Sequence, residues 1–258
     1  VTSGKSTEQA GKIAFASLER ATSDLASGKI DVLVTAPINK KNIQNENFNF
    51  HGHTEYLTQL SNMEDSLMLM VYENLKVSLA TNHIPISELA NTINVDGLLR
   101  KITLLNTTLT KDFRILKPKI AVLGLNPHAG ELGLLGNEEK KHINPAIENA
   151  KNNDILCFGP FPSDGFFGSG NYKYFDGVLA MYHDQGLTPF KTIASGRGVN
   201  FTAGLPIVRT SPDHGTAYDI AGKGIASCTS MRNAIYLAVD IHNKRLFNKS
   251  LYANTLTI

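Results

Sequence analysis

The chain has 258 residues, of which 42% are hydrophobic and 19% are charged, and its formal net charge is +2. This composition is typical of a globular protein long enough for one large α/β domain or two smaller lobes. The balanced charge disfavours nucleic acid or an anionic membrane surface as a partner. No apolar run is long enough to span a bilayer, and the opening residues lack the basic and apolar regions of a signal peptide.

The cysteine content indicates the redox compartment of the protein. Cys157 and Cys228 are too few for a disulfide framework and have no spacing typical of a metal site. We therefore expect them to be reduced, in a cytoplasmic protein.

Helical and strand signals alternate along the chain. In chain order, apolar spacing predicts a helix over residues 7–26, strands over 30–37 and 75–80, a helix over 86–105, a strand over 119–125, a helix over 138–152, a strand over 177–182 and an amphipathic helix over 231–247. The strand runs are mostly apolar on both faces, as in parallel strands covered by helices. The pattern predicts an α/β protein with a mostly parallel sheet.

Three histidines follow three of these predicted strands. His83, His128 and His183 each stand just past the carboxyl end of an apolar run. Ligands of open α/β sheets bind at that edge, and neutral imidazole is a common ligand of zinc and similar ions. Three histidines would leave positions free for substrate oxygens, as in a catalytic metal site. A hydrogen-bonded loop histidine is the alternative for each of them taken singly.

A second group of candidates surrounds small residues. His53 and Thr54 follow Gly52, which permits a close backbone approach to a ligand. The basic and amide side chains near Gly196 and Gly198 suit a phosphate or carboxylate, and they are Lys191, Arg197, Asn200 and Arg209. A solvated charged loop is the alternative, and for Arg197 alone it is the better one.

Common nucleotide-binding motifs are missing. No Gly-x-Gly-x-x-Gly fingerprint occurs, because Gly196-Arg197-Gly198 lacks the third glycine. Residues 3–7, Ser-Gly-Lys-Ser-Thr, imitate the end of a P-loop, but a helix N-terminus capped by Ser or Thr explains them better. The sequence does not favour a kinase.

Several longer blocks resemble one known family. They are residues 34–40, 52–55, 125–131 and 159–164, followed by a long block through 181–186, 196–200, 209–211 and 213–217. In order and in detail these blocks are similar to the 4-hydroxythreonine-4-phosphate dehydrogenase family of vitamin B6 biosynthesis. Residues 213–226 are also similar to the adenine-side loop of isocitrate and isopropylmalate dehydrogenases, which bind nicotinamide cofactors without the glycine fingerprint.

The resemblance implies a fold and a domain organisation. It implies a two-lobed α/β/α fold like that of isocitrate and isopropylmalate dehydrogenases, with the active site in the inter-lobe cleft. We expect a cofactor-side lobe from residues 1–47 and 200–258, and a metal, substrate and dimerisation lobe from residues 48–199. Family members begin with a strand and a Gly-Asp-Pro-Ala-Gly-Ile-Gly-type loop that has no counterpart here. We therefore expect the chain to lack the family's N-terminal segment.

The resemblance also implies roles for individual residues. It implies a divalent ion (zinc, magnesium or cobalt) on His83, His128 and His183, in a homodimer whose subunits share the active site. It implies substrate contacts from His53, Thr54, Lys191, Asn200 and Arg209. The cofactor, NAD or NADP, would lie against His214, Gly215, Thr216 and Ala217.

The expected reaction is oxidation of 4-phosphohydroxy-L-threonine to a β-keto acid that loses CO2 and leaves 3-amino-2-oxopropyl phosphate. Asp164 and Lys191 are the candidate proton acceptors, and Asp184 is either another or the group that orients His183. Three alternatives stay open. They are a dehydrogenase of a threonate or erythronate 4-phosphate, a metal-dependent phosphohydrolase, and a non-catalytic binding protein for a phosphorylated ligand.

Overall fold

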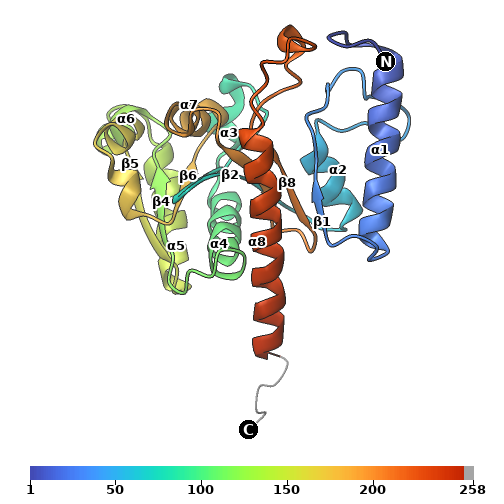
Figure 1. Ribbon diagram of the computed structural model, residues 1–258. Helices are drawn as coiled ribbons and strands as arrows, with labels where there is room; N and C mark the ends of the chain where they lie inside the picture. The colour runs from blue at the N-terminus through green and yellow to red at the C-terminus, as the bar shows by residue number, and fades with distance from the viewer. Residues whose placement is uncertain (253–258) are drawn as a thin grey trace. The chain divides into compact units, whose positions relative to one another are not determined.

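A computed structural model describes residues 1–252 of the chain (Figure 1). The chain forms two compact units. Of the described residues, the first unit contains 1–66 and 196–243, and the second contains 67–195 and 244–252. The unit boundaries thus fall at residues 66, 195 and 243, whereas the lobe boundaries predicted from the sequence fall at 47 and 199. The roles predicted for the two lobes stay predictions.

Three strands form the sheet of the first unit. They are β1 (Val32–Val34), β7 (Val199–Ala203) and β8 (Val208–Pro212), in the order β1-β8-β7. β1 pairs with β8 in parallel, whereas β7 and β8 are antiparallel, with Phe201 opposite Thr210. The pairing continues past the end of β1, because the Thr35 amide donates to the Thr210 carbonyl.

Three α-helices among the described residues belong wholly or partly to the first unit. They are α1 (Glu8–Ala26), α2 (His53–Leu60) and the N-terminal part of α8 (Thr229–Tyr252), drawn in red in Figure 1. Thr7 caps α1, because its hydroxyl accepts from the Ala10 amide at 3.2 Å. Leu18, Leu33, Phe48 and Leu57 form a buried core between α1, β1 and α2.

The second unit has five strands. They are β2 (Leu67–Tyr72), β3 (Leu75–Leu79), β4 (Lys119–Leu123), β5 (Leu156–Phe161) and β6 (Gly177–Ala180), in the order β2-β3-β6-β4-β5. β2 and β3 form an antiparallel hairpin. β3, β6, β4 and β5 are parallel to one another.

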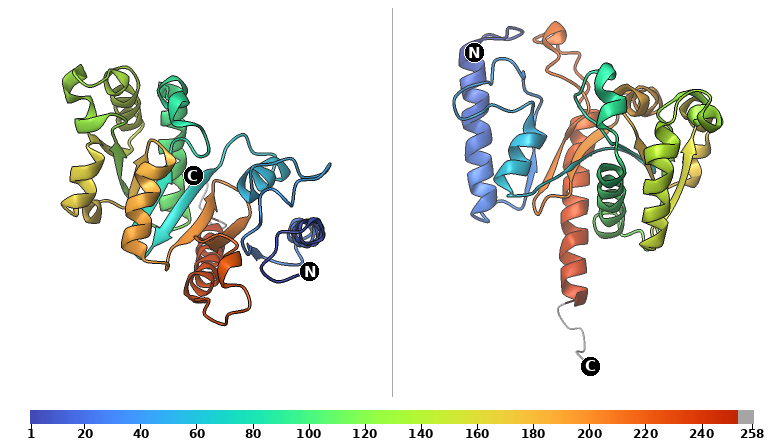
Figure 2. Two further views of the ribbon diagram at one scale, coloured as in Figure 1. Left: turned by 90° about the horizontal axis from the view of Figure 1, so that it is seen from above. Right: turned by 180° about the vertical axis from the view of Figure 1, so that it is seen from behind.

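Helices cover both faces of these strands (Figure 2). The α-helices are α3 (Leu89–Thr92), α4 (Val95–Lys111), α5 (Asn144–Asn152), α6 (Ser163–Gly168) and α7 (His183–Ala194). On one face Phe190 of α7 packs with Val77 and Val178 of the sheet. On the other face α4 approaches so closely that a Cβ at Gly177 would lie 2.8 Å from a methyl group of Leu109. Glycine at 177 therefore permits this helix–sheet contact.

Several predicted elements are confirmed, and one is wrong. The strands expected over 75–80, 119–125 and 177–182 are β3, β4 and β6, and the helix expected over 7–26 is α1. The helix expected over 86–105 is interrupted. A 3-10 turn (Ile86–Glu88) and α3 come first, and α4 starts anew at Val95.

The interruption has a local cause. Asn94 is extended, and its side chain accepts from the Gly97 amide at 2.9 Å. Asparagine prefers this capping position to a helix interior, so it ends one helix and starts the next. The predicted α/β class is confirmed, with the β2–β3 and β7–β8 pairs as the antiparallel exceptions to a mostly parallel arrangement. Within residues 1–252, no helix is both long and apolar enough to cross a bilayer.

Candidate functional site

The three predicted metal histidines follow three neighbouring strands of the second unit. β6 lies between β3 and β4 and is parallel to both. The carboxyl ends of the three strands therefore point to one edge of the sheet, and His83, His183 and His128 follow β3, β6 and β4 respectively. The rings of His83 and His183 lie close together, with 5.8 Å between their centroids.

A carboxylate orients one of these rings. Nδ1 of His183 lies 2.7 Å from Oδ1 of Asp184. Since a carboxylate only accepts, Nδ1 donates in this contact, and in the neutral tautomer that fits it the lone pair is on Nε2. Histidines that bind metals commonly have such a carboxylate partner.

His83 and His183 line a pocket of about 250 Å³, together with Asn82, Tyr182 and Asp184. The Oδ1 atom of Asn82 is buried and has no hydrogen-bond partner in the part of the chain that the structure describes. A buried acceptor without a donor costs free energy, so a ligand that supplies positive charge or a donor would stabilise it. Two imidazoles and an amide oxygen suit a borderline divalent cation. His128 does not complete the set, because no three His, Cys, Asp or Glu side chains in residues 1–252 are grouped as a metal site.

His128 lies in a loop of unusual conformation. Five consecutive residues from His128 to Leu132 have positive φ angles, between 43° and 80°, and only one of them, Gly130, is a glycine. A left-handed backbone costs a non-glycine residue roughly 1–2 kcal/mol. Such a run persists only where the surroundings hold it, and strained backbone is common at functional sites.

The first unit brings together the predicted anion-binding residues. Arg209 on β8 is 3% exposed, and its guanidinium donates to the hydroxyl groups of two threonines. The contacts to Thr35 are 3.0 Å from Nε and 2.6 Å from Nη2, and the contact to Thr202 is 3.1 Å from Nη1. Burial lowers the pKa of Arg209 to about 10, although Glu55 opposes this effect. The guanidinium therefore stays charged at neutral pH.

The positive charge of Arg209 also acts on the pKa of His53. It is the first residue of α2, and burial, together with the positive charges of Arg209 and Lys40, lowers its pKa to about 3. The imidazole is therefore neutral at physiological pH. Thr54 follows in the same helical turn and is half-buried.

Asn200 extends the same surface. Side chains alternate along a strand, so Asn200 and Thr202 project from the same face of β7. Thr202 binds Arg209, and the Oδ1 atom of Asn200 is buried without a hydrogen-bond partner among the described residues. One face of this sheet thus holds a cation and an unused acceptor, which suits a ligand with both an anionic group and a donor.

The other predicted residues lie on helices and loops. Asp164 is exposed in the first turn of α6, and Lys191 is exposed in the last turn of α7. The predicted cofactor residues His214, Gly215, Thr216 and Ala217 form a loop after β8. Ser230 of α8 holds the base of this loop, because its hydroxyl accepts from the Asp213 amide and donates to the Gly198 carbonyl. The roles of all these residues stay predictions.

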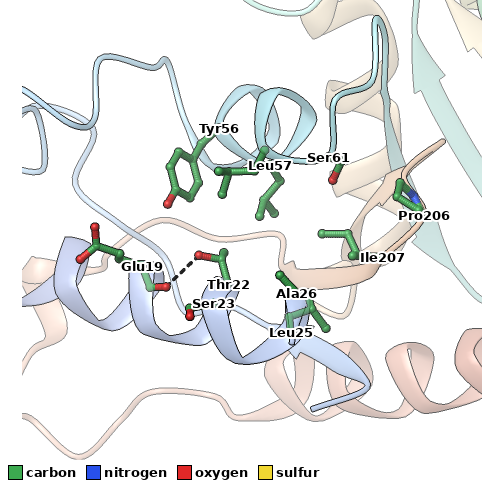
Figure 3. Close-up of a pocket in the computed structure, with 11 residues that line it drawn as sticks. Glu19, Thr22, Ser23, Leu25, Ala26, Tyr56, Leu57, Ser61, Pro206 and Ile207 are labelled. Atoms are coloured by element: carbon green, nitrogen blue, oxygen red, sulfur yellow. Dashed lines mark hydrogen bonds between the residues drawn. The ribbon is translucent and has the colours of Figure 1, made fainter. Parts of the chain in front are cut away.

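A separate pocket of about 390 Å³ lies between α1 and α2 in the first unit. Figure 3 shows Leu25, Ala26, Leu57 and Ile207 around it, with Glu19 at one side. None of the predicted site residues lines this pocket. We therefore do not assign the site to it.

The sequence interpretation did not identify some of the candidate residues. Thr35 and Thr202 were not expected to hold Arg209, and Asn82 was not expected to present a buried acceptor. The signal was weak but present, since Thr35 and Asn82 stand close to the carboxyl ends of their strands, where polar residues line ligand sites.

The parallel and antiparallel strands and the helices packed on them place the chain among the mixed α/β proteins. An isocitrate dehydrogenase structure from Methylococcus capsulatus is 16% identical and has a TM-score of 0.51, and the match covers 84% of this chain and 70% of that protein's chain. At this identity the likeness concerns the fold alone. The structure of 4-hydroxythreonine-4-phosphate dehydrogenase from Klebsiella pneumoniae is more similar. It has 40% identity and a TM-score of 0.81, and it covers 93% of this chain and 72% of its own.

Sequence comparison narrows the class to a family. The family model described as "Pyridoxal phosphate biosynthetic protein PdxA" matches residues 1–238. The 4-hydroxythreonine-4-phosphate dehydrogenase of Bacteroides thetaiotaomicron is 54% identical over 249 residues, which are 96% of this chain and 68% of that protein. The chain belongs to the PdxA family. The family and fold predicted from the sequence blocks are confirmed, and the matched segment includes all the predicted site residues.

Proposed function

We propose that this protein is an oxidoreductase that oxidises 4-phosphohydroxy-L-threonine with NAD or NADP in pyridoxal phosphate biosynthesis. The observation that carries the proposal is the placement of His83, His128 and His183 after three adjacent parallel strands, inside a segment that matches the family. When the carbinol C–H bond breaks, a bound nicotinamide would accept the hydride and a base would accept the hydroxyl proton. The resulting β-keto acid releases CO2, and the remaining carbon takes up a proton to give 3-amino-2-oxopropyl phosphate.

The first unit would bind the anionic end of the substrate. Arg209 supplies a permanent charge whose orientation is fixed by Thr35 and Thr202, so little entropy is lost when it binds an anion. Asn200 offers an acceptor to a substrate hydroxyl or ammonium group. His53 is neutral because its pKa is lowered to about 3, so it can donate one hydrogen bond and accept another without adding charge.

The second unit would hold the divalent ion. His83 and His183 are already close, and His128 is the third proposed ligand. When bound, the ion would lower the pKa of the substrate hydroxyl and stabilise the negative charge that develops on oxygen. Asp184 keeps the Nε2 lone pair of His183 available by accepting from Nδ1.

Three groups are candidates for the proton acceptor. Lys191 and Asp164 are both exposed on helices of the second unit, and Lys191 is also a proposed substrate contact. Asp184 already accepts from His183, which favours an orienting role for it. The loop of His214, Gly215, Thr216 and Ala217 is the proposed cofactor contact.

The test is the appearance of reduced-nicotinamide absorbance. The protein is mixed with a divalent ion, NAD or NADP, and 4-phosphohydroxy-L-threonine, with and without a chelator. We expect reduction that stops when the chelator removes the ion. Reduction only with a threonate or erythronate 4-phosphate would identify that compound as the substrate instead. Phosphate release without any cofactor would instead establish a phosphohydrolase and overturn the proposal.

We also propose that two copies of the chain associate and share the site. Leu132 and Leu134 follow His128 in its loop and are 89% and 81% exposed. Large exposed apolar side chains beside a proposed ligand suit a protein contact better than solvent. Light scattering should show a dimer, and the double substitution of Leu132→Glu and Leu134→Glu should give monomers. Leu116→Glu is the matched control, since Leu116 is 90% exposed elsewhere in the same unit. A monomeric wild-type protein would exclude the dimer.

A further inference from the structure

One buried carboxylate, that of Glu139, lies against the His128 loop. Glu139 is 3% exposed and begins a π-helical turn, Glu139–Ile143, ahead of α5. Turns of this kind are rare and are frequent at functional sites when they do occur. No role for Glu139 follows from the sequence blocks or from the proposed chemistry, so the burial of this anion needs a separate explanation.

Three N–H groups of the loop bind this carboxylate. Oε1 accepts from the backbone amides of Leu125 and Asn126 at 2.8 and 2.7 Å, and Oε2 accepts from the side-chain amide of Asn126 at 3.0 Å. Hydrogen bonds to an ionised acceptor are stronger than those between neutral groups. A carboxylate has two oxygens that both accept, whereas an amide has an N–H₂ donor in place of one of them, so converging donors select a carboxylate over an amide.

The contact extends to both sides of His128. Leu125 and Asn126 precede His128, and Gly130 follows it. A Cβ at Gly130 would lie 2.6 Å from Oε2 of Glu139, so the absence of a side chain there lets the loop close around the carboxylate. A Cβ at Gly124 would lie 3.3 Å from Oε1 and 2.9 Å from Ala129. The backbone on both sides of His128 thus packs closely around the side chain of Glu139.

We propose that Glu139 is a positioning residue that sets the orientation of His128 as a metal ligand. The inference rests on the proposed metal role of His128. The backbone from His128 to Leu132 is left-handed, which L-residues avoid, so it needs an anchor that fixes the chain on either side. Glu139 provides that anchor from an element outside the loop. It acts on the ion only through His128 and has no contact with substrate.

The test compares metal binding by wild-type protein, Glu139→Gln, Glu139→Ala and a control. Gln keeps one oxygen for the two backbone amides but turns an N–H₂ group toward Asn126, whereas Ala removes all three bonds. Glu148→Gln is the matched control, because Glu148 lies on α5, has a side chain 64% exposed and forms an ion pair with Lys151. Affinity for Zn²⁺ is measured by calorimetry, and ligand geometry by the visible spectrum of bound Co²⁺.

We expect Glu139→Gln to weaken Zn²⁺ binding about tenfold and Glu139→Ala about 100-fold, which is the range for residues that orient metal ligands. The Co²⁺ spectrum should change in both variants and stay the same in Glu148→Gln. The thermal midpoint of the metal-free Glu139→Gln protein should stay close to that of the wild type, which separates positioning from general destabilisation.

The outcomes distinguish the two proposals. Wild-type protein that binds no divalent ion would overturn the metal site itself. Wild-type protein that binds an ion, with both Glu139 variants matching it in affinity and spectrum, would leave the metal site standing and overturn the role of Glu139. A loss of affinity in Glu139→Ala that Gln restores completely, with an unchanged spectrum, would also overturn it, because packing alone would then explain the loss.

Discussion

The two units hold their polar groups in different ways. In the first unit the cation of Arg209 lies within the sheet, and side chains on neighbouring strand segments fix its orientation. In the second unit the histidines follow the strands, so loop conformation and partners such as Asp184 determine where the rings point. A sheet arranges an anion site in advance, whereas a site on loops depends on every contact that supports the loops.

The strongest test of this comparison removes a metal ligand. His183→Ala should lower kcat/KM by about 10³-fold or more, because stabilisation of the developing oxygen charge is worth several kcal/mol. The thermal midpoint of the metal-free protein should change little, since the His183 side chain at the start of α7 is 41% exposed and contributes little packing. His242→Ala on α8 is the control and should keep full activity. If His183→Ala retained most of its turnover, the metal assignment would be wrong.

The second test exploits the cost of burying Arg209. Burial lowers the pKa of Arg209 to about 10, which means that its charged form costs the folded protein about 3 kcal/mol at neutral pH. An apolar residue of similar size removes this cost but leaves the buried hydroxyls of Thr35 and Thr202 without their donor, so the free energy of unfolding of Arg209→Met should stay close to that of the wild type in urea. Its KM should nevertheless rise about 100-fold, because a charge-paired contact to the substrate is lost.

Arg209→Lys sharpens the same comparison. Lysine keeps the charge but has no planar fork to bind Thr35 and Thr202 together, so an intermediate KM is expected. If Arg209→Met instead unfolded readily and kept a normal KM, the arginine would be structural.

The sequence located the strands that precede the proposed metal ligands, but it did not predict the contacts that hold functional side chains in place. Apolar runs ending at His83, His128 and His183 located three strands, because burial on both faces leaves a continuous apolar signal. The hydroxyl partners of Arg209 were not predictable, because Thr35 and Arg209 are far apart in the chain and meet only through strand pairing. The bonds to Glu139 and the left-handed loop were missed for the same reason, since no local pattern encodes a contact between separate elements.

A third, smaller effect is expected at Asp184. Asp184→Asn keeps the size of the side chain but removes the charge that strengthens the bond to Nδ1 of His183. Zn²⁺ affinity should fall about tenfold in calorimetry, as for other carboxylates that orient metal-binding histidines. Asp154→Asn is the control, because Asp154 is exposed in the same unit and has a φ of 59° that asparagine also tolerates. Equal affinities in the two variants would remove Asp184 from the site and leave His183 oriented by its backbone.

The last expected effect is a dependence of stability on pH that belongs to the first unit. His53 has a folded pKa of about 3, below the ordinary value of 6.5, because of burial and the charges of Arg209 and Lys40. Below pH 6.5 the unfolded chain gains a proton at this residue and the folded chain does not, so stability falls from there down to about pH 3. Between about pH 7.5 and pH 5 the loss should be about 2 kcal/mol. Urea unfolding at both pH values should show a smaller loss for His53→Asn than for the wild type. His51→Asn is the control, since His51 is exposed two residues away and should leave the wild-type dependence intact. A pH dependence unchanged by His53→Asn would mean that His53 can take up a proton in the folded state, and the neutral imidazole beside Arg209 would have to be abandoned.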